Sequence, residues 1–233
     1  MEDLGVSLIV ILITGATVAG IFIGLAARKR KQDSALVLAA AERGWAIQKI
    51  QHPLISGYRI SGQLAGGGWA LESRRDASPT SAAPGSSEVS LNTVWYSEAA
   101  RLLGRAVVIG ALPSGAGAAS VPSFADDFIL MGLRAMLGAD AEWTGRLKKV
   151  ELNDPLLGGR FLALADDAAD VARLLDGEAV RLLAGLPQKY RPVVKLRENG
   201  LTVSLQGWQL VRPEEIQQLV SLGAALLKAW NSQ

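Results

Sequence analysis

The stretch PVVKLRENGLTVSLQGW, residues 192–208, is where the sequence specifies its fold most clearly. Asn199-Gly200 is the dipeptide that favours a two-residue type I′ turn between antiparallel strands. Pairing outward from this turn opposes Glu198 and Leu201, Leu196 and Val203, and Val194 and Leu205. The apolar members of these pairs then share one face, and Lys195, Arg197, Thr202 and Ser204 share the other. Turn and alternation therefore agree on a hairpin with one buried face.

Helices are expected on both sides of this hairpin. Pro213 followed by two Glu is typical of a helix start. The apolar face that follows is expected to pack on the sheet and contains Ile216, Leu219, Val220, Gly223, Leu227 and Trp230. Upstream, residues 160–165 (RFLALA) predict a strand, and residues 166–177 and 178–187 predict two short helices.

The first part of the chain predicts a second α+β unit. Residues 34–43 form a helical pattern that Gly44 ends, and short β-like runs follow at 58–64, 69–74, 94–99 and 105–112. Residues 76–87 and 113–122 have loop composition, and residues 123–137 predict a helix. The expected fold class is thus α+β, with an N-terminal transmembrane helix before a soluble region of two halves. The expected boundaries are 1–31 for the anchor, 34–137 for the first half and 138–233 for the second. The two halves could share one sheet or form two subdomains.

The anchor prediction rests on residues 6–27, which contain no ionisable side chain. A helix of this length spans a hydrocarbon core of roughly 30 Å. The cations follow the apolar stretch as Arg28, Lys29, Arg30 and Lys31. A secretory signal has its cations in front, so the pattern favours an uncleaved anchor. Lys and Arg residues that flank a membrane span usually remain on its cytoplasmic side. We therefore expect a single-pass protein of the bacterial inner membrane, with its N-terminus outside and its main domain in the cytoplasm. The opposite orientation is the alternative.

Small residues in the predicted span could form a helix-packing face. Ala16, Gly20 and Gly24 recur every four residues, and Thr17 lies beside them. Such spacings also arise by chance in apolar helices. The basic run Arg28–Lys31 would meet lipid headgroups.

Composition excludes several kinds of site. The chain has 233 residues and no Cys, so it has no disulfide, thiol nucleophile or thiolate metal site. Setting aside the basic run, Glu2 and Asp3, the remaining chain has as many Lys and Arg as Asp and Glu. This neutral balance does not favour a nucleic-acid partner.

The sequence has no recognisable catalytic constellation, so no catalytic, cofactor-binding or metal-binding residue is assigned. The only histidine, His52, precedes a proline at an expected strand end. Asp166, Asp167 and Asp170 lie at a helix start, where carboxylates usually act as caps. The glycines at 66–68 and 115–117 match neither phosphate-binding pattern, and Ser114 and Ser120 lack a nucleophile elbow.

Aromatic and basic residues suggest a possible interface. Trp143 with Lys148 and Lys149 could contact lipid headgroups or a partner, or could form an ordinary solvated turn. Trp230 is the tryptophan that we expect to be exposed and could anchor a partner, or could simply close the last helix.

Two segments, Phe161–Leu175 and Val193–Leu205, together with the anchor, resemble bacterial single-span membrane proteins classed only as domains of unknown function. The resemblance covers about a quarter of the chain. It implies a membrane location and an α+β fold, and it carries over no catalytic residue.

These observations favour a membrane-anchored, non-catalytic interaction protein. It would be an accessory or assembly subunit of a bacterial membrane complex, or a homo-oligomer associating through its first helix. A hydrolase-like enzyme with its site near loop 113–122 is the alternative, and a module that binds the lipid surface is a third.

Overall fold

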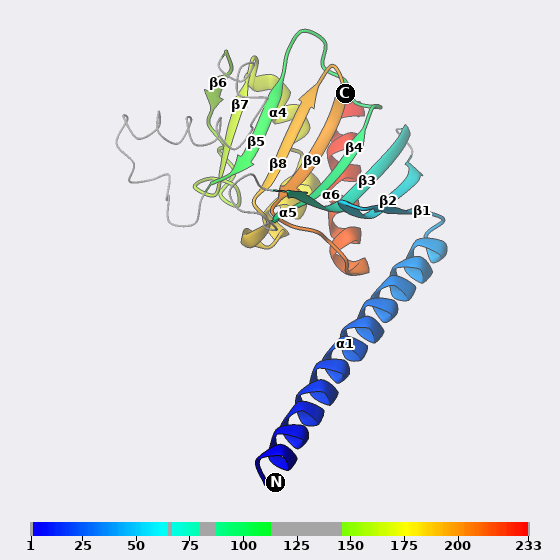
Figure 1. Cartoon of the computed structure of the whole chain (residues 1–233). Helices are drawn as coiled ribbons and strands as arrows, with labels where there is room; N and C mark the ends of the chain where they lie inside the picture. The colour runs from blue at the N-terminus through cyan, green and yellow to red at the C-terminus, as the bar shows by residue number, and fades with distance from the viewer. Residues whose placement is uncertain (1, 65–66, 80–86, 113–145, 233) are drawn as a thin grey trace.

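The computed structural model describes residues 2–64, 67–79, 87–112 and 146–232, with side chains of the first helix from Gly20 on, Phe22 and Lys29 excepted. Within these ranges a helix, α1 (Glu2–Glu42), leads into a sheet of nine strands. Figure 1 shows α1 projecting away from the rest of the molecule, with the C-terminus at the far end of the sheet domain. The sheet domain therefore contains the core, and α1 forms an arm.

All described strand pairs are antiparallel, in the order β1-β2-β3-β4-β9-β8-β5-β7-β6. The strands are β1 (Ala46–His52), β2 (Ile55–Leu64), β3 (Gly67–Pro79), β4 (Ser87–Ser97), β5 (Val107–Ala111), β6 (Lys148–Val150), β7 (Phe161–Ala165), β8 (Pro192–Arg197) and β9 (Gly200–Gln206). The hairpin β8–β9 lies between β4 and β5, both of which precede it by many residues. Strands of the two predicted halves thus share one sheet.

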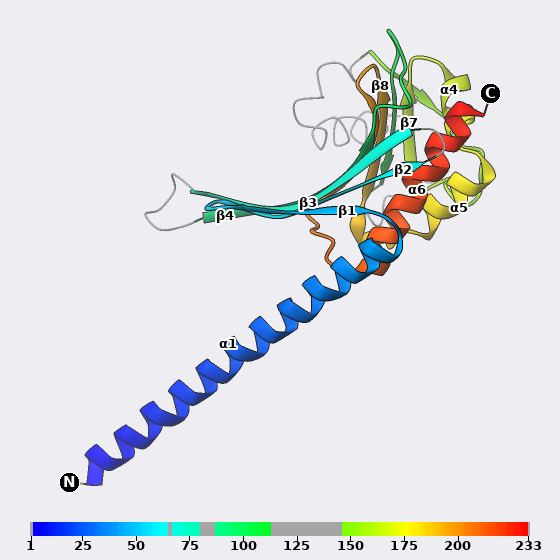
Figure 2. The ribbon, with the colours of Figure 1, turned by 90° about the vertical axis from the view of Figure 1, so that its right-hand side faces the viewer.

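The helices that the structure describes in the domain cover one face of the sheet (Figures 1 and 2). They are α4 (Ala168–Leu174), α5 (Gly177–Gly185), the 3₁₀ turn η2 (Gln188–Tyr190) and α6 (Pro213–Asn231). Asp167 caps α4 through its carboxylate, as the sequence predicts for a helix start, and Asp176, which the sequence placed inside the preceding helix, caps α5. Gly223 of α6 leaves room for the buried ring of Trp95, because a Cβ there would overlap the indole.

The hairpin forms with its predicted apolar face but in a different register. Val194, Leu196, Val203 and Leu205 are all fully buried on the helix side. Leu196 pairs with Leu201 and Val194 with Val203, a shift of two residues from the prediction, so the two-residue loop is Glu198-Asn199. A shift of two keeps every side chain on its face, which is why the face prediction is correct and the pairing prediction is wrong.

The predicted fold class is corrected by this architecture. The expected two α+β halves are one large antiparallel sheet with few helices. Within the residues that the structure describes, no helix combines the length and apolar character needed to cross a membrane. The predicted transmembrane anchor is therefore wrong. Residues 6–27 instead belong to α1, a single helix that runs on past Arg28–Lys31.

The last turns of α1 attach the arm to the domain. Leu36 and Ala40 are buried, Lys49 of β1 pairs with Asp33 at 2.7 Å, and Arg43 donates to Gln217 of α6 at 2.7 Å. The helix ends as predicted before Gly44, which has a positive φ of 67°. Between Gly20 and Arg30 every side chain that the structure describes is exposed (Figure 2).

Candidate functional site

The most promising site is a cleft on the face of β2, β3 and β4 opposite α6. Trp95 and Leu71 point toward the helices, so the alternation of the strands places Ala70 and Tyr96 on the opposite face. Ser61, Ala70 and Tyr96 lie in one row across the three strands. The methyl group of Ala70 and the bare backbone of Gly68 form the floor, because both are small residues on the central strand. Longer side chains on β2 and β4 form the walls.

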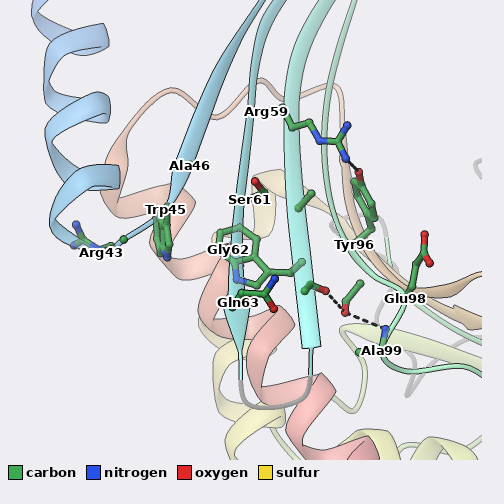
Figure 3. A pocket seen from close by; sticks show the side chains of 15 residues that line it. Arg43, Trp45, Ala46, Arg59, Ser61, Gly62, Gln63, Tyr96, Glu98 and Ala99 are labelled. Atoms are coloured by element: carbon green, nitrogen blue, oxygen red, sulfur yellow. Dashed lines mark hydrogen bonds between the residues drawn. The ribbon is translucent and has the colours of Figure 1, made fainter.

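The cleft has a volume of about 850 Å³ and continues around the edge of the sheet. β1 begins at Ala46, opposite Ser61, so the last residues of β2 extend past it. Through this opening the cleft reaches the end of α1 and the start of β1 (Figure 3). Its lining residues are Arg43, Gly44, Trp45, Ala46, Arg59, Ser61, Gly62, Gln63, Gly68, Trp69, Ala70, Tyr96, Ser97, Glu98 and Ala99.

Arg59 and Tyr96 form one wall. The Arg59 guanidinium donates to the Tyr96 hydroxyl and lies 5.8 Å from the centre of its ring. Figure 3 shows this bond spanning from β2 to β4. Glu72 lies 3.8 Å from Arg59, beyond hydrogen-bond distance, and also approaches Arg74 at 4.0 Å. Among the described residues the Arg59 guanidinium thus has one hydrogen bond, to Tyr96, and one ion-pair partner, Glu72.

Two tryptophans line the opposite end. Trp45 and Trp69 meet edge to face with ring centres 5.4 Å apart, and the Arg43 guanidinium lies 5.5 Å from the Trp45 ring centre. Trp69 is 4% exposed, and its indole N–H has no acceptor within the described part of the chain. Gly62 makes room for this indole, since a Cβ there would come within 2.9 Å of the ring. Trp69 points to the same face as Leu71 and Trp95, so its indole packs in the core behind the floor of the cleft.

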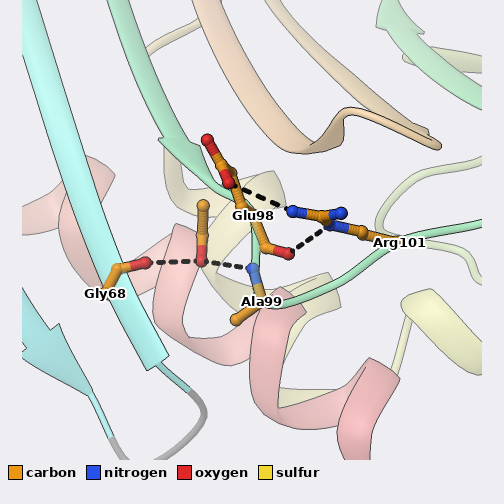
Figure 4. A network of polar contacts seen from close by, with 5 residues as sticks. Gly68, Glu98, Ala99 and Arg101 are labelled. Atoms are coloured by element: carbon orange, nitrogen blue, oxygen red, sulfur yellow. Dashed lines mark hydrogen bonds and ion pairs between the residues drawn. The ribbon is translucent and has the colours of Figure 1, made fainter.

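A hydrogen-bond network supports the lower end of the cleft. The Ser97 hydroxyl donates to the Gly68 carbonyl at 2.8 Å and accepts from the Ala99 N–H at 3.2 Å (Figure 4). Arg101 contacts the Glu98 carboxylate at 3.1 Å and also donates to the Glu98 carbonyl. The only acidic side chain in the lining is therefore already paired with a cation outside it.

The residues singled out in the sequence do not gather here. The side chains of Ala16 and Thr17, and all of Trp143 and loop 113–122, lie outside the described residues. A Cβ added at Gly20 or Gly24 would meet no described atom within 4 Å other than the backbone of α1 itself. Lys148 and Lys149 are exposed in β6, at the far edge of the sheet, and His52 is exposed at the end of β1. Trp230 is buried at 7% exposure beneath Arg173, so the expected exposure is wrong.

The carboxylate cluster has a structural role, as predicted. Asp167 caps α4, Asp166 accepts from the Ala106 N–H at 2.7 Å, and Arg105 lies 3.1 Å from the buried Asp170. Burial raises the pKa of Asp170, and the Arg105 cation opposes that shift. Among the described residues no cluster of His, Asp and Glu side chains is arranged to hold a metal ion.

Sequence reasoning missed the cleft because its lining comes from segments with no common motif. The alternation Arg59, Ser61, Gln63 indicates one polar face of a strand, which is ordinary for an antiparallel sheet. The small residues Gly68 and Ala70 were the available signal for a hollow, but only with the register of β3 known.

No protein-family model and no curated protein matches the chain. Among solved structures, the crystal structure of the mycobacterial trehalose monomycolate transport factor A, TtfA, is similar with a TM-score of 0.41 and 11% sequence identity. The match covers 87% of this chain and 94% of that one. A likeness this weak does not establish a common function, and the resemblance to single-span membrane proteins stays a prediction.

Proposed function

We propose that this chain is a non-catalytic interaction protein, an accessory or assembly subunit of a bacterial membrane protein complex. The observation that carries this proposal is the arm formed by α1. Its exposed part bears Ile21, Ile23 and Leu25, which are 57%, 70% and 58% exposed. Apolar side chains grouped on a projecting helix are typical of a surface that a partner covers.

The attachment of α1 supports a docking role. Its last turns are held by buried Leu36 and Ala40 and by the Asp33–Lys49 ion pair, whereas the described side chains before Lys31 are exposed. Burying three such side chains contributes roughly 1.5–3 kcal/mol each to an association. A second copy of the chain could supply the same contact, which would make the assembly a homo-oligomer.

The native mass of the full chain, after gentle extraction from bacterial membranes, tests this proposal. We expect a stoichiometric complex heavier than one chain. Replacing Ile21, Ile23 and Leu25 with Ser should dissociate it, because the apolar contact is lost. Leu103→Ser is the matched control, since Leu103 is 79% exposed and belongs to the sheet domain rather than to α1. A monomer in the unmodified protein, or equal dissociation by the control, would refute the docking role of α1.

The same preparation tests the proposed location at the cytoplasmic face of the inner membrane. Arg28, Arg30 and Lys31 are exposed just after the apolar residues of α1 and suit the headgroups of anionic lipids. We expect the chain in the membrane fraction at low salt, with Arg28→Gln/Arg30→Gln/Lys31→Gln weakening that association. Recovery of the unmodified chain in the soluble fraction at low salt would contradict the location.

A further inference from the structure

Four exposed cations lie around the segment that connects β9 to α6. Lys189 and Arg191 belong to the turn before β8, Arg212 immediately precedes α6, and Arg75 belongs to β3. None of these side chains has a carboxylate partner within the part of the chain that the structure describes. We call these four residues the cationic surface.

Hydrogen bonds to the sheet bring Arg75 close to the other three. The Ser73 hydroxyl donates to the Leu210 carbonyl of the connecting segment at 2.8 Å, and the Gln209 side chain donates to the Ser56 carbonyl at 3.4 Å. Ser56 is the register partner of Arg75, and Arg75 points to the same face as Ser73. The connecting segment therefore runs beside Arg75, on the sheet face that α6 covers.

An aromatic side chain accompanies the cations. The Lys189 ammonium lies 4.9 Å from the ring centres of both Tyr190 and Trp208, and the Trp208 indole donates to the Lys189 carbonyl at 2.8 Å. Trp208 is half-buried, so part of its ring remains exposed beside the ammonium. Tryptophan with neighbouring cations is typical of surfaces that meet the headgroup region of a bilayer, where apolar and polar surroundings adjoin.

The backbone of Arg191 indicates that its side chain has a role outside the fold. Among the described residues it is the non-glycine residue with a positive φ, of 42°, and it directly precedes Pro192. Glycine would adopt this conformation without strain. A strained residue with an exposed side chain is grounds for a functional hypothesis, because the strain persists where glycine would relieve it.

Charge and orientation point to the same partner. Glu214 and Glu215 follow in the first turn of α6, and Glu215 already accepts from the Tyr190 hydroxyl, so the cations exceed the carboxylates. Figures 1 and 2 show the turn before β8 and the start of α6 at the end of the domain from which α1 projects. A membrane that contacts α1 would therefore face the cationic surface.

We propose that Arg75, Lys189, Arg191 and Arg212, together with Trp208, form a contact between the sheet domain and an anionic lipid surface. The cations contact the lipid phosphates, and Trp208 lies at the level of the headgroups. The cations come from three separate segments and do not line the cleft described above, which suits an extended surface and not a single small anion. This inference rests on the proposed location at the inner membrane and adds a second contact to that of α1.

Co-sedimentation of the full chain with lipid vesicles at low salt tests this inference. Every chain carries Arg28→Gln/Arg30→Gln/Lys31→Gln, so that the cations of α1 do not contribute. The vesicles are phosphatidylcholine alone or a mixture with roughly one-third phosphatidylglycerol, which is anionic. The ratio of the two binding constants reports the charge contact, because any apolar contact of α1 is common to both. We expect this background chain to prefer the anionic vesicles at least about tenfold, and the preference to fall as salt is added.

Two substitutions of Arg191 separate binding from folding. Arg191→Gly should reduce the preference about fivefold, the contribution of one cation at an anionic surface. Its midpoint of urea unfolding should stay unchanged or rise, because glycine suits the positive φ. Arg191→Lys keeps the charge and should keep the preference within about twofold.

A triple substitution and a matched control locate the contact. Lys189→Gln/Arg191→Gln/Arg212→Gln should abolish most of the preference for anionic vesicles. The control removes the same charge from exposed cations beside the β8–β9 turn, in β6 and in the last turn of α6. It is Arg101→Gln/Lys148→Gln/Lys228→Gln, and we expect it to retain the preference.

Three results would overturn the proposal. Equal binding of the background chain to both kinds of vesicle would assign the whole charge contact to α1. Equal losses in the triple variant and its control would show a general attraction of cations to the vesicles. An unchanged preference in both Arg191→Gly and the triple variant would remove the cationic surface from the contact. A monomeric native chain that still prefers anionic vesicles through this surface would refute the docking role of α1 and support the lipid contact.

Discussion

Gly200 shows how one residue sets the register of the central hairpin. It opens β9 with a φ of 119°, and a Cβ there would collide with the Ser97 carbonyl of β4. Its partner is Arg197, so it belongs to a strand and not to the two-residue loop. Because Gly200 has no side chain, β4 can approach β9 closely at this point. The Asn-Gly turn motif gives no indication of this contact between distant strands.

Gly200→Ala should therefore destabilise the protein by roughly 3 kcal/mol, from left-handed strain and the collision with Ser97 together. Gly207→Ala is the matched control. Gly207 also has a positive φ, of 79°, but nothing lies within 4 Å of the position its Cβ would take. Its substitution should cost only about 1 kcal/mol. Urea unfolding measures both values, and equal costs would mean that the Ser97 contact contributes nothing.

At the scale of elements, Tyr190 joins the turn before β8 to the start of α6. Its hydroxyl donates to the Glu215 carboxylate at 2.8 Å, and its ring meets Trp208 edge to face at 5.2 Å. Burial and the bond to Glu215 raise the pKa of Tyr190 to about 12. The neutral phenol is the form that donates, so the native state holds this proton more tightly than the unfolded chain does.

This linkage predicts a stability loss at alkaline pH. The contribution of Tyr190 is fully present below pH 10, the ordinary pKa of the phenol, and declines as the pH rises from 10 towards 12. The difference in unfolding free energy between the unmodified protein and Tyr190→Phe should therefore shrink over that range. Urea titrations of both proteins at several pH values between 8 and 11.5 measure it, with Lys and Arg titration common to both. A constant difference would show that Tyr190 titrates normally.

At the scale of the whole molecule, one sheet joins segments from both ends of the chain. β9 pairs with β4 on one side and, through β8, connects to β5 and β7 on the other. Leu201, Val203 and Leu205 of β9 are fully buried in the core cluster that also contains Leu71, Trp95 and Leu226. A destabilising substitution in the hairpin should therefore affect the strands that flank it in both directions, β2–β3 and β5–β7.

Leu201→Ala should lower the stability of the whole domain by about 2–5 kcal/mol, as truncation of a buried leucine does. Hydrogen exchange measures this by segment, and we expect β2–β3 and β5–β7 to lose protection together. Leu103→Ala, at an exposed turn, should leave both unchanged. Loss confined to one side would mean that the two sides unfold as separate units.

The sequence by itself determined the local features of this protein: the buried face of the hairpin, the carboxylate cap of α4, the helix from Pro213 and the helix end before Gly44. Each depends on a few neighbouring residues, whose periodicity and backbone preferences act over short range. Only the tertiary structure decided that the strands form a single sheet, that Gly200 lies in β9 beside β4 and not in the turn, and that Trp230 is buried. These features depend on strands and helices that are distant in sequence. The tertiary structure also decided that residues 6–27 belong to a longer helix. The cleft required the same information, because Ser61, Ala70 and Tyr96 become neighbours only once β2, β3 and β4 pair.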